Sequence, residues 1–418
     1  MARTGRNTPA VLRLLLFILT ALALGWGALA AVTAAQHAAA ATQVVNSSEP
    51  LSLDAQQIYQ SLADADVSIS TGNLYAQQPL ADRERYQDDM ATVAAGLRTA
   101  TAASGPDSPV AGSLAALSAG LPVYTGYVAD SEVYDSQNLP AGGSYTEVAS
   151  EEMHLVLLPA ARTVYDQENA QLTAASATAT GLPLAVIAIV AGLLAGLIAF
   201  RAQRWLANRT KRRVNQGLFV ATVAGVAALV WLAVALLAGR SDMLQAIQHG
   251  SGPAETLAQA DIGALQARGD EALNLISHTG DAGFQSDIHA IAGQLNSQLA
   301  QASAASTTAD AALISDAGQA AKAWFNVNQQ LHVLDLANNY GLETRLAIGT
   351  GPGSATAAFA SFQNDLSTAI AADQKVFASS AAAAQDAFNG LEIGVIVLAL
   401  VMAAGCAWGL SRRLVEYR

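Results

Sequence analysis

Four long apolar runs constrain the fold of this chain more than any other feature. They cover residues 11–32, 182–200, 218–238 and 393–410. The hydrocarbon core of a bilayer needs roughly 20 apolar residues per helix, so each run is about long enough to cross it. The last three runs contain no ionisable side chain, and the first contains only Arg13, near its start. The sequence therefore predicts four transmembrane helices.

Charge separates the remaining segments into two classes. Twelve of the 21 basic residues lie in the short segments 1–10, 201–217 and 411–418 or at Arg13. These segments contain a single acidic residue, Glu416. The intervals 33–181 and 239–392 hold the other 32 of the 33 acidic residues. Short loops rich in Arg and Lys stay in the cytoplasm. We expect a multi-pass plasma-membrane protein with both termini cytoplasmic and the two long intervals outside.

The first run could instead be a secretory signal peptide. Ala28, Ala30 and Ala31 resemble a cleavage site of small residues. The apolar stretch is longer than the 7–15 residues usual in signal peptides, which favours an uncleaved anchor. Cleavage would leave the rest of the topology unchanged.

The basic segments at the predicted cytoplasmic face are candidate contacts. The residues are Arg201, Arg204, Trp205, Arg209, Lys211, Arg212, Arg213, Arg412 and Arg413. Topology alone explains their charge, but they could also contact anionic membrane lipid or an acidic cytosolic partner. A nucleic-acid-binding role is disfavoured because the loop is too short to form a domain.

The two exterior intervals are predicted to be helical. Ile58, Leu62, Ala65 and Ile69 follow the spacing of one helix face, and alternating strand patterns are rare. The stretches SLADADVSIS (61–70) and TLAQADIGAL (256–265) are similar and lie at comparable depth, which indicates a tandem duplication. We predict an all-α protein with four transmembrane helices and two extracytoplasmic, sensor-like four-helix bundles in tandem. The bundle helices are expected to continue unbroken into the spans, with a kink at Pro159.

No catalytic, cofactor-binding or metal-ligating set is recognisable. The six histidines lack the spacing of a metal site, and His154, which follows Glu151 and Glu152, indicates a solvated helix face. The single cysteine, Cys406, lies inside the fourth run, which excludes an internal disulfide. We therefore expect a protein that is not an enzyme and holds no metal or cofactor.

Aromatic and small residues supply two further groups of candidates. The aromatic residues Tyr124, Tyr127, Tyr134, Trp324, Phe325 and Tyr340 interrupt Ala-rich helices, as core packing or as an exterior partner contact. Small residues at four-residue spacing within the spans allow helices to approach closely but do not specify a dimer face, so a homodimer is left open. These are Gly192, Gly196, Ala221, Gly225, Gly405 and Gly409.

Three stretches carry a family resemblance. Residues 121–172, SLADADVSIS and AKAWFNVNQQLHVLD (321–335) resemble actinobacterial four-span membrane proteins of the GlnX type. The resemblance implies a transmembrane relay that couples an extracytoplasmic amino-acid-binding lipoprotein to a cytosolic G-type serine/threonine kinase. The chain differs from chemoreceptors and histidine kinases, whose sensor bundles it resembles, because it lacks a signalling domain.

The distribution of folded mass supports a relay independently. The three cytoplasmic segments are too short to fold into an enzyme, so any output must pass through a partner. The alternative is a scaffold or accessory subunit of a transport or cell-envelope complex that does not signal.

Overall fold

The computed structural model of the chain describes residues 8–75, 79–137, 139–210, 215–277, 282–306 and 308–415. Within these ranges all regular secondary structure is helical. Four helical segments are long and apolar enough to cross a membrane, which confirms the predicted fold class and supports a multi-pass membrane protein. The chain divides into two compact units. The membrane unit holds residues 1–45, 174–244 and 380–418, and the bundle unit holds 46–173 and 245–379.

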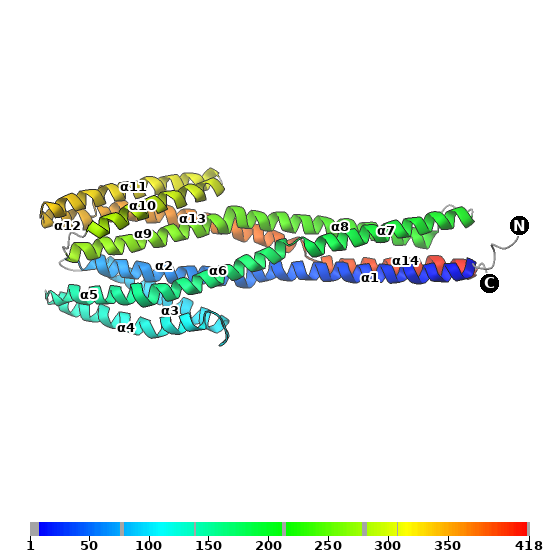
Figure 1. The fold of residues 1–418 in the computed structure, drawn as a ribbon, viewed down its shortest axis with the longest axis horizontal. Helices are drawn as coiled ribbons and strands as arrows, with labels where there is room; N and C mark the ends of the chain where they lie inside the picture. The colour runs from blue at the N-terminus through cyan, green and yellow to red at the C-terminus, as the bar shows by residue number, and fades with distance from the viewer. Residues whose placement is uncertain are drawn as a thin grey trace. The chain divides into compact units, whose positions relative to one another are not determined.

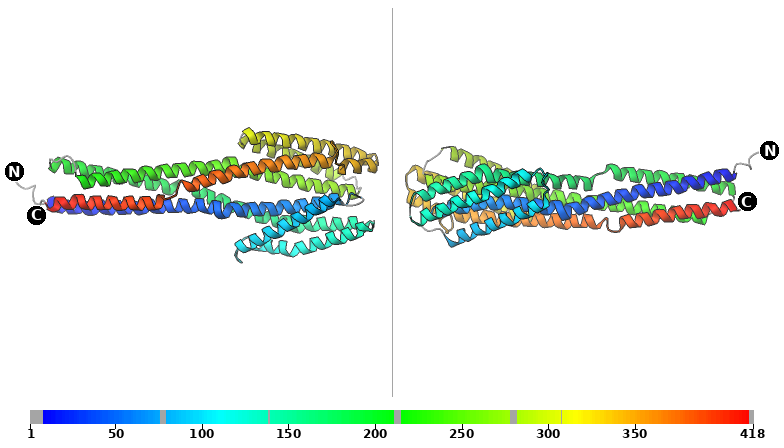
Figure 2. Two further views of the ribbon diagram at one scale, coloured as in Figure 1. Left: turned by 180° about the vertical axis from the view of Figure 1, so that it is seen from behind. Right: turned by 90° about the horizontal axis from the view of Figure 1, so that it is seen from below.

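The membrane unit contains the four apolar helices. They are α1 (Thr8–Gln43), α7 (Pro183–Thr210), α8 (Gln216–Ala246) and α14 (Leu391–Val415). Helix α1 packs along α14, as Figure 2 shows, and also contacts α7. The indole Nε1 of Trp26 on α1 donates to the carbonyl oxygen of Ala188 on α7 at 2.9 Å. This bond satisfies the polar atom of a buried tryptophan.

The membrane unit exposes many large apolar side chains, and many of its buried residues are small, beside a few buried leucines. Phe17, Leu194 and Leu237 are exposed, whereas Ala188 and Ala228 are fully buried. A bilayer is as apolar as leucine, so helices in it associate through close packing of small residues rather than by burying large ones. This distribution suits lipid contact around the outside of the unit.

Glycines bring α8 and α14 into backbone contact. A Cβ added at Gly405 would lie 2.8 Å from the carbonyl oxygen of Gly217 and 3.2 Å from the Cβ of Ala221. A Cβ at Gly409 would also meet Gly217. A side chain at either position of α14 would therefore push the two helices apart.

The other three candidate packing residues differ from one another. A Cβ at Gly192 would lie 2.6 Å from both Trp26 and Leu229, and one at Gly225 would touch Met402. A Cβ at Gly196 would meet no atom within 4 Å. Only Gly192 of the pair on α7 is therefore required by close packing.

The bundle unit consists of two halves with the same order of helices. The first half contains α2 (Glu49–Gly72), α3 (Leu80–Ala103), α4 (Ala111–Ser136), α5 (Ala141–Glu152) and α6 (Leu158–Thr180). The second contains α9 (Gly252–Ser277), α10 (Ala282–Ala305), α11 (Thr308–Leu336), α12 (Tyr340–Ile348) and α13 (Ala355–Asp386). Helices α6 and α13 each continue for a few residues into the membrane unit.

The two halves share one hydrophobic core. Helix α2 lies beside α9, as Figure 1 shows, and the buried side chains of both halves form a single cluster. Ile58 and Leu62 on α2 and Leu257 and Leu265 on α9 are almost fully buried in it. The halves therefore pack together around one core instead of forming two separate bundles.

Three π-helical turns interrupt the helices, each two residues before a proline. They are Val44–Ser48 before Pro50, Met153–Leu157 before Pro159, and Ile247–Ser251 before Pro253. A proline ring clashes with the carbonyl four residues earlier and lacks an N–H, and the extra residue of a π turn relieves both problems. The irregularity expected at Pro159 thus takes the form of a π turn.

Helical continuity between the bundle helices and the spans holds at two of the four connections. The π turns join α1 to α2 and α8 to α9 without a break. The expectation of unbroken helices is wrong for the other two. Helix α6 ends at Thr180 and α7 begins at Pro183, because the residue before a proline disfavours the helical conformation. Helix α13 ends before Gly390, whose φ of +72° is the left-handed conformation that terminates helices.

The structural repeat corrects the alignment suggested by sequence similarity. Pro50 and Pro253 occupy corresponding places at the start of α2 and α9, 203 positions apart. The stretches SLADADVSIS and TLAQADIGAL start 195 positions apart. They are thus displaced by about two helical turns, and do not occupy equivalent positions in the two halves.

Candidate functional site

A polar cavity of about 390 Å³ lies inside the bundle unit, where the two halves meet. Helices α2 and α3 supply one wall, and α9 and α13 supply the other. We call it the aspartate pocket after the three acidic residues that line it, Asp64, Asp89 and Asp261. Its other polar lining residues are Gln56, Gln57, Gln60, Ser61, Gln363, Ser367 and Gln374. Its volume lies within the range of small-molecule sites.

One arginine partly neutralises the aspartate pocket. Arg85 on α3 donates from Nε and Nη2 to the two carboxylate oxygens of Asp64 on α2, both at 2.7 Å. The same Nη2 also donates to Oε1 of Gln363 on α13 at 2.7 Å. A bidentate pair of this kind is strong and directional. The Arg85 side chain thus connects α2, α3 and α13, and it engages both carboxylate oxygens of Asp64.

The other two aspartates have no such counter-charge. Burial, followed by the neighbouring charge of Asp64, raises the pKa of Asp89 to about 8. The same two causes, in the same order, raise the pKa of Asp261 to about 7. Asp89 Oδ2 and Asp261 Oδ1 are enclosed without a hydrogen-bond partner. The pocket therefore holds two carboxyl groups that a cation would stabilise in their ionised form.

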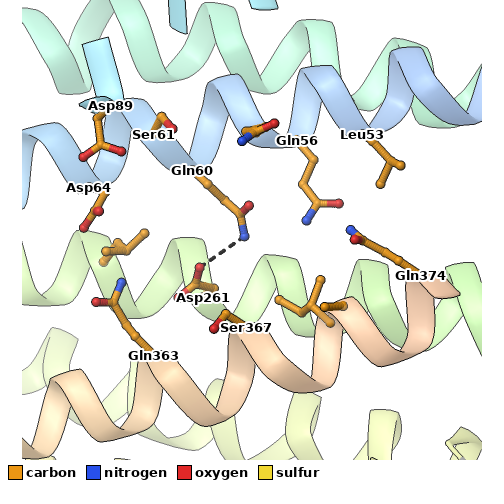
Figure 3. Close-up of a pocket in the computed structure, with 14 residues that line it drawn as sticks. Leu53, Gln56, Gln60, Ser61, Asp64, Asp89, Asp261, Gln363, Ser367 and Gln374 are labelled. Atoms are coloured by element: carbon orange, nitrogen blue, oxygen red, sulfur yellow. Dashed lines mark hydrogen bonds between the residues drawn. The ribbon is translucent and has the colours of Figure 1, made fainter. Parts of the chain in front are cut away.

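Glutamine amides also line the aspartate pocket, and Gln56 and Gln374 lie at the end away from Asp64 and Asp89, as Figure 3 shows. Gln60 Nε2 on α2 donates to Asp261 Oδ2 on α9 at 3.1 Å. Gln56 is only 7% exposed, and its amide points into the cavity toward α13. It has no side-chain hydrogen bond to any residue that the structure describes. Amides both donate and accept, so this end can accommodate polar groups of either kind.

A second cavity occupies the corresponding place on the opposite side of the α2–α9 pair. It measures about 250 Å³ and takes its walls from α9 and α10 of one half and α2 and α6 of the other. Its charged lining residues are Arg162 and Asp166 on α6, and Arg162 Nε lies 3.8 Å from Asp166 Oδ2. This second cavity therefore lacks the excess of acidic groups that the aspartate pocket has.

The aromatic candidates lie elsewhere and do not form one site. Tyr124 and Trp324 are fully buried, and Phe325 stacks on Trp324 with ring centroids 4.7 Å apart. Tyr134 stacks on Tyr145 with ring centroids 5.2 Å apart. Tyr127 is half-buried against the core, and the hydroxyl of the exposed Tyr340 donates to Asn338. The packing of Tyr124 and Trp324 leaves them no surface for a partner.

Two buried polar networks brace the helices around the core. In the first half, Asp66 accepts hydrogen bonds from Ser150 Oγ at 2.9 Å and from His154 Nε2 at 3.2 Å. His154 therefore bonds across to α2, whereas the sequence predicted a solvated helix face. In the second half, the Arg268 guanidinium pairs with Glu271, which also accepts from Trp324 Nε1 at 2.9 Å.

The structure describes only some of the basic residues that the sequence indicated as candidate contacts. Arg201 and Arg204 on α7 and Arg412 on α14 are exposed, and the Arg412 guanidinium lies 5.1 Å from the centre of the Trp408 ring. Trp205 is half-buried against the apolar core of the membrane unit. Lys211, Arg212 and Arg213 lie outside the described residues, as do the side chains of Arg209 and Arg413. Within the described ranges, no group of three His, Cys, Asp or Glu residues could hold a metal ion.

Sequence reasoning missed the residues of the aspartate pocket. A signal was present at Asp261, because its neighbours on the same helix face are apolar, namely Leu257, Ala258, Ala264 and Leu265. An aspartate inside an apolar run indicates a buried group with a specific partner. The similarity between the two stretches SLADADVSIS and TLAQADIGAL predicted a tandem duplication and not a site.

Comparison with known proteins identifies part of the chain. Residues 40–177 match the family model described as an actinobacterial sensor domain. No curated protein and no solved structure shows significant similarity to the chain. The match supports an actinobacterial sensor protein with a sensing or signalling role. The matched residues include the α2 and α3 wall of the aspartate pocket.

Proposed function

We propose that this chain is a membrane sensor that relays an extracytoplasmic signal to a cytosolic partner. The observation that carries the proposal is the match of residues 40–177 to an actinobacterial sensor domain. Four helices suited to cross a membrane and a separate bundle unit are the architecture that such a relay requires.

The connections between the units support a mechanical relay. The chain passes between the two units four times, and at two of these connections only a π turn lies between the span and the bundle helix. A ligand that prefers one arrangement of the bundle helices would shift the balance between two states by its difference in affinity. Small shifts of packed helices are a common way to transmit such a change.

The cytosolic partner is proposed to be a serine/threonine kinase, and the exterior partner an amino-acid-binding lipoprotein. Both come from the resemblance to four-span proteins of the GlnX type. The exposed Arg201, Arg204 and Arg412 offer a positive surface for an acidic partner face. The acidic composition of the bundle unit would suit a lipoprotein with a basic docking face.

Copurification tests this proposal. We expect an affinity-tagged full chain, extracted from actinobacterial membranes, to retain a serine/threonine kinase, identified by mass spectrometry. Replacing Arg201, Arg204 and Arg412 together by Gln should remove the kinase, whereas Arg162→Gln in the bundle unit should not. Recovery of transporter or cell-envelope subunits without a kinase would contradict the relay and favour the scaffold.

A further inference from the structure

We propose that the aspartate pocket binds a small organic molecule that carries an ammonium group, such as a basic amino acid or a short diamine. The inference rests on the proposed sensory role in one respect, because it names the class of ligand that the bundle unit would sense. The geometry of the cavity is independent of that role.

The charge of the pocket selects a cation. Three aspartates line it, and Arg85 engages only Asp64 directly. On the remaining elements, α13 contributes Gln363, Ser367 and Gln374, which are uncharged, and α9 contributes Asp261 itself. An ammonium group between Asp89 and Asp261 would provide the counter-charge that the protein lacks, and charge-assisted hydrogen bonds are about twice as strong as neutral ones.

The shape of the pocket favours an organic cation over a metal ion. Among the described residues no three carboxylate, imidazole or thiol groups lie close enough together to hold a metal. The cavity is far larger than a single ion, at about 390 Å³, and it extends from the aspartates to the amide of Gln56. Gln56 is more than nine-tenths buried and has no hydrogen-bond partner within the described part of the chain.

The Gln56 amide faces the cavity without a hydrogen bond to the described residues, which leaves it available to a polar group of a ligand at that end of the pocket. Leu265 and Ile370 add apolar surface to the lining of the pocket. The pocket thus presents carboxylates, amides and apolar surface to a ligand. An amino acid or diamine with an aliphatic chain carries groups that complement all three.

Titration of the two aspartates gives the binding a pH signature. The charged groups that face them are Asp64 and Arg85, and burial is the larger cause of both raised pKa values. A bound ammonium group would favour the ionised carboxyls, so that binding near pH 7 releases protons. Affinity should therefore increase between pH 6 and pH 8.5.

Calorimetry on the purified full chain in detergent tests the proposal, with lysine and putrescine as cationic probes. Glutamate and calcium chloride serve as controls. We expect at least one cationic probe to bind, and Asp89→Asn and Asp261→Asn each to weaken it by about tenfold or more. Asp166→Asn, in the corresponding cavity, should leave the affinity unchanged.

Each of three outcomes would overturn the proposal. The cationic probes do not bind, they bind equally well to the Asp89 and Asp261 variants, or only calcium binds. Thermal unfolding of each variant shows whether it is folded, and both replacements preserve the shape of the side chain. Calorimetry measures ligand binding without any cytosolic partner. Failure to copurify a kinase would therefore contradict the proposed relay but not the ligand-binding proposal.

Discussion

The Nε2 atom of His154 lies 3.2 Å from Oδ2 of Asp66, across the interface between the π turn Met153–Leu157 and helix α2. Asp66 is 3% exposed, and Ser150 donates to the same oxygen. The hydrogen bond to Asp66 is the main cause that raises the pKa of His154, and burial opposes it. The contact therefore stabilises the bundle most when the imidazole is protonated.

The first prediction concerns His154→Gln. A raised folded-state pKa contributes stability that is fully present below the unfolded pKa of about 6.5 and disappears as pH rises through the folded value. The melting temperature of the full chain should therefore fall more at pH 6 than at pH 8.5 when His154 is replaced. Thermal unfolding at the two pH values measures the difference. His289→Gln, at an exposed position, should show no such trend, and an equal loss at both pH values for His154→Gln would refute the linkage.

Asp89→Asn should stabilise the chain at alkaline pH. Because the folded pKa is raised to about 8, the folded protein binds a proton that the unfolded chain has already released. The free energy of unfolding thus decreases as pH rises from about 4 towards 8. The asparagine side chain does not ionise, so the variant avoids this decrease. We expect the variant to melt a few degrees above the parent at pH 8.5 and closer to it at pH 5. The exposed neighbour Asp88, replaced by Asn, is the matched control; a parallel gain there would exclude the pocket as the cause.

Arg268→Met should destabilise the bundle unit strongly. The guanidinium is 2% exposed and donates to Glu271, to Thr356 and to the carbonyl oxygen of Ala347. Removing one member of a buried ion pair costs about 3–5 kcal/mol, because it leaves the other charge buried without a partner. Denaturant or thermal unfolding measures the loss, and Arg162→Met in an exposed pair should cost less than about 1 kcal/mol. Replacing Glu271 by Leu in the same chain should recover part of the stability; without such recovery, the packing of the arginine stem and not its charge would dominate.

The sequence predicted the architecture well because the responsible signals are local. Twenty consecutive apolar residues specify a span, and the periodicity from Ile58 to Ile69 specifies a helix, whatever lies elsewhere in the chain. The position of Pro159 similarly predicted an irregular turn, although not its π-helical form. Both helix breaks were also encoded locally, at Pro183 and Gly390, but the uninterrupted Ala-rich composition around them concealed the signal.

The aspartate pocket could not be predicted in the same way, because it depends on the register of distant helices. Asp64, Asp261 and Gln363 are separated by one to three hundred residues and meet only because α2 packs beside α9. Sequence similarity suggested a register that is wrong by about two turns, which would place different side chains together. The aromatic candidates Tyr124 and Trp324 failed as contact residues for a simpler reason. Large aromatic side chains in an Ala-rich bundle fill the core that alanine leaves open.

The last prediction compares two glycines of the membrane unit. A side chain at Gly405 would collide with the backbone of Gly217 and with Ala221, whereas Gly196 faces open space. Overpacking a close helix contact costs about 1–3 kcal/mol or more, so Gly405→Leu should lower the melting temperature in detergent and separate α8 from α14. Gly196→Leu should change stability by less than about 0.5 kcal/mol. Disulfide formation between cysteines at Gly225 and Met402, which face each other across the two helices, reports the helix separation directly in a Cys406→Ser background. If both leucine variants form this disulfide as readily as the parent, α8 and α14 are not held by their small residues.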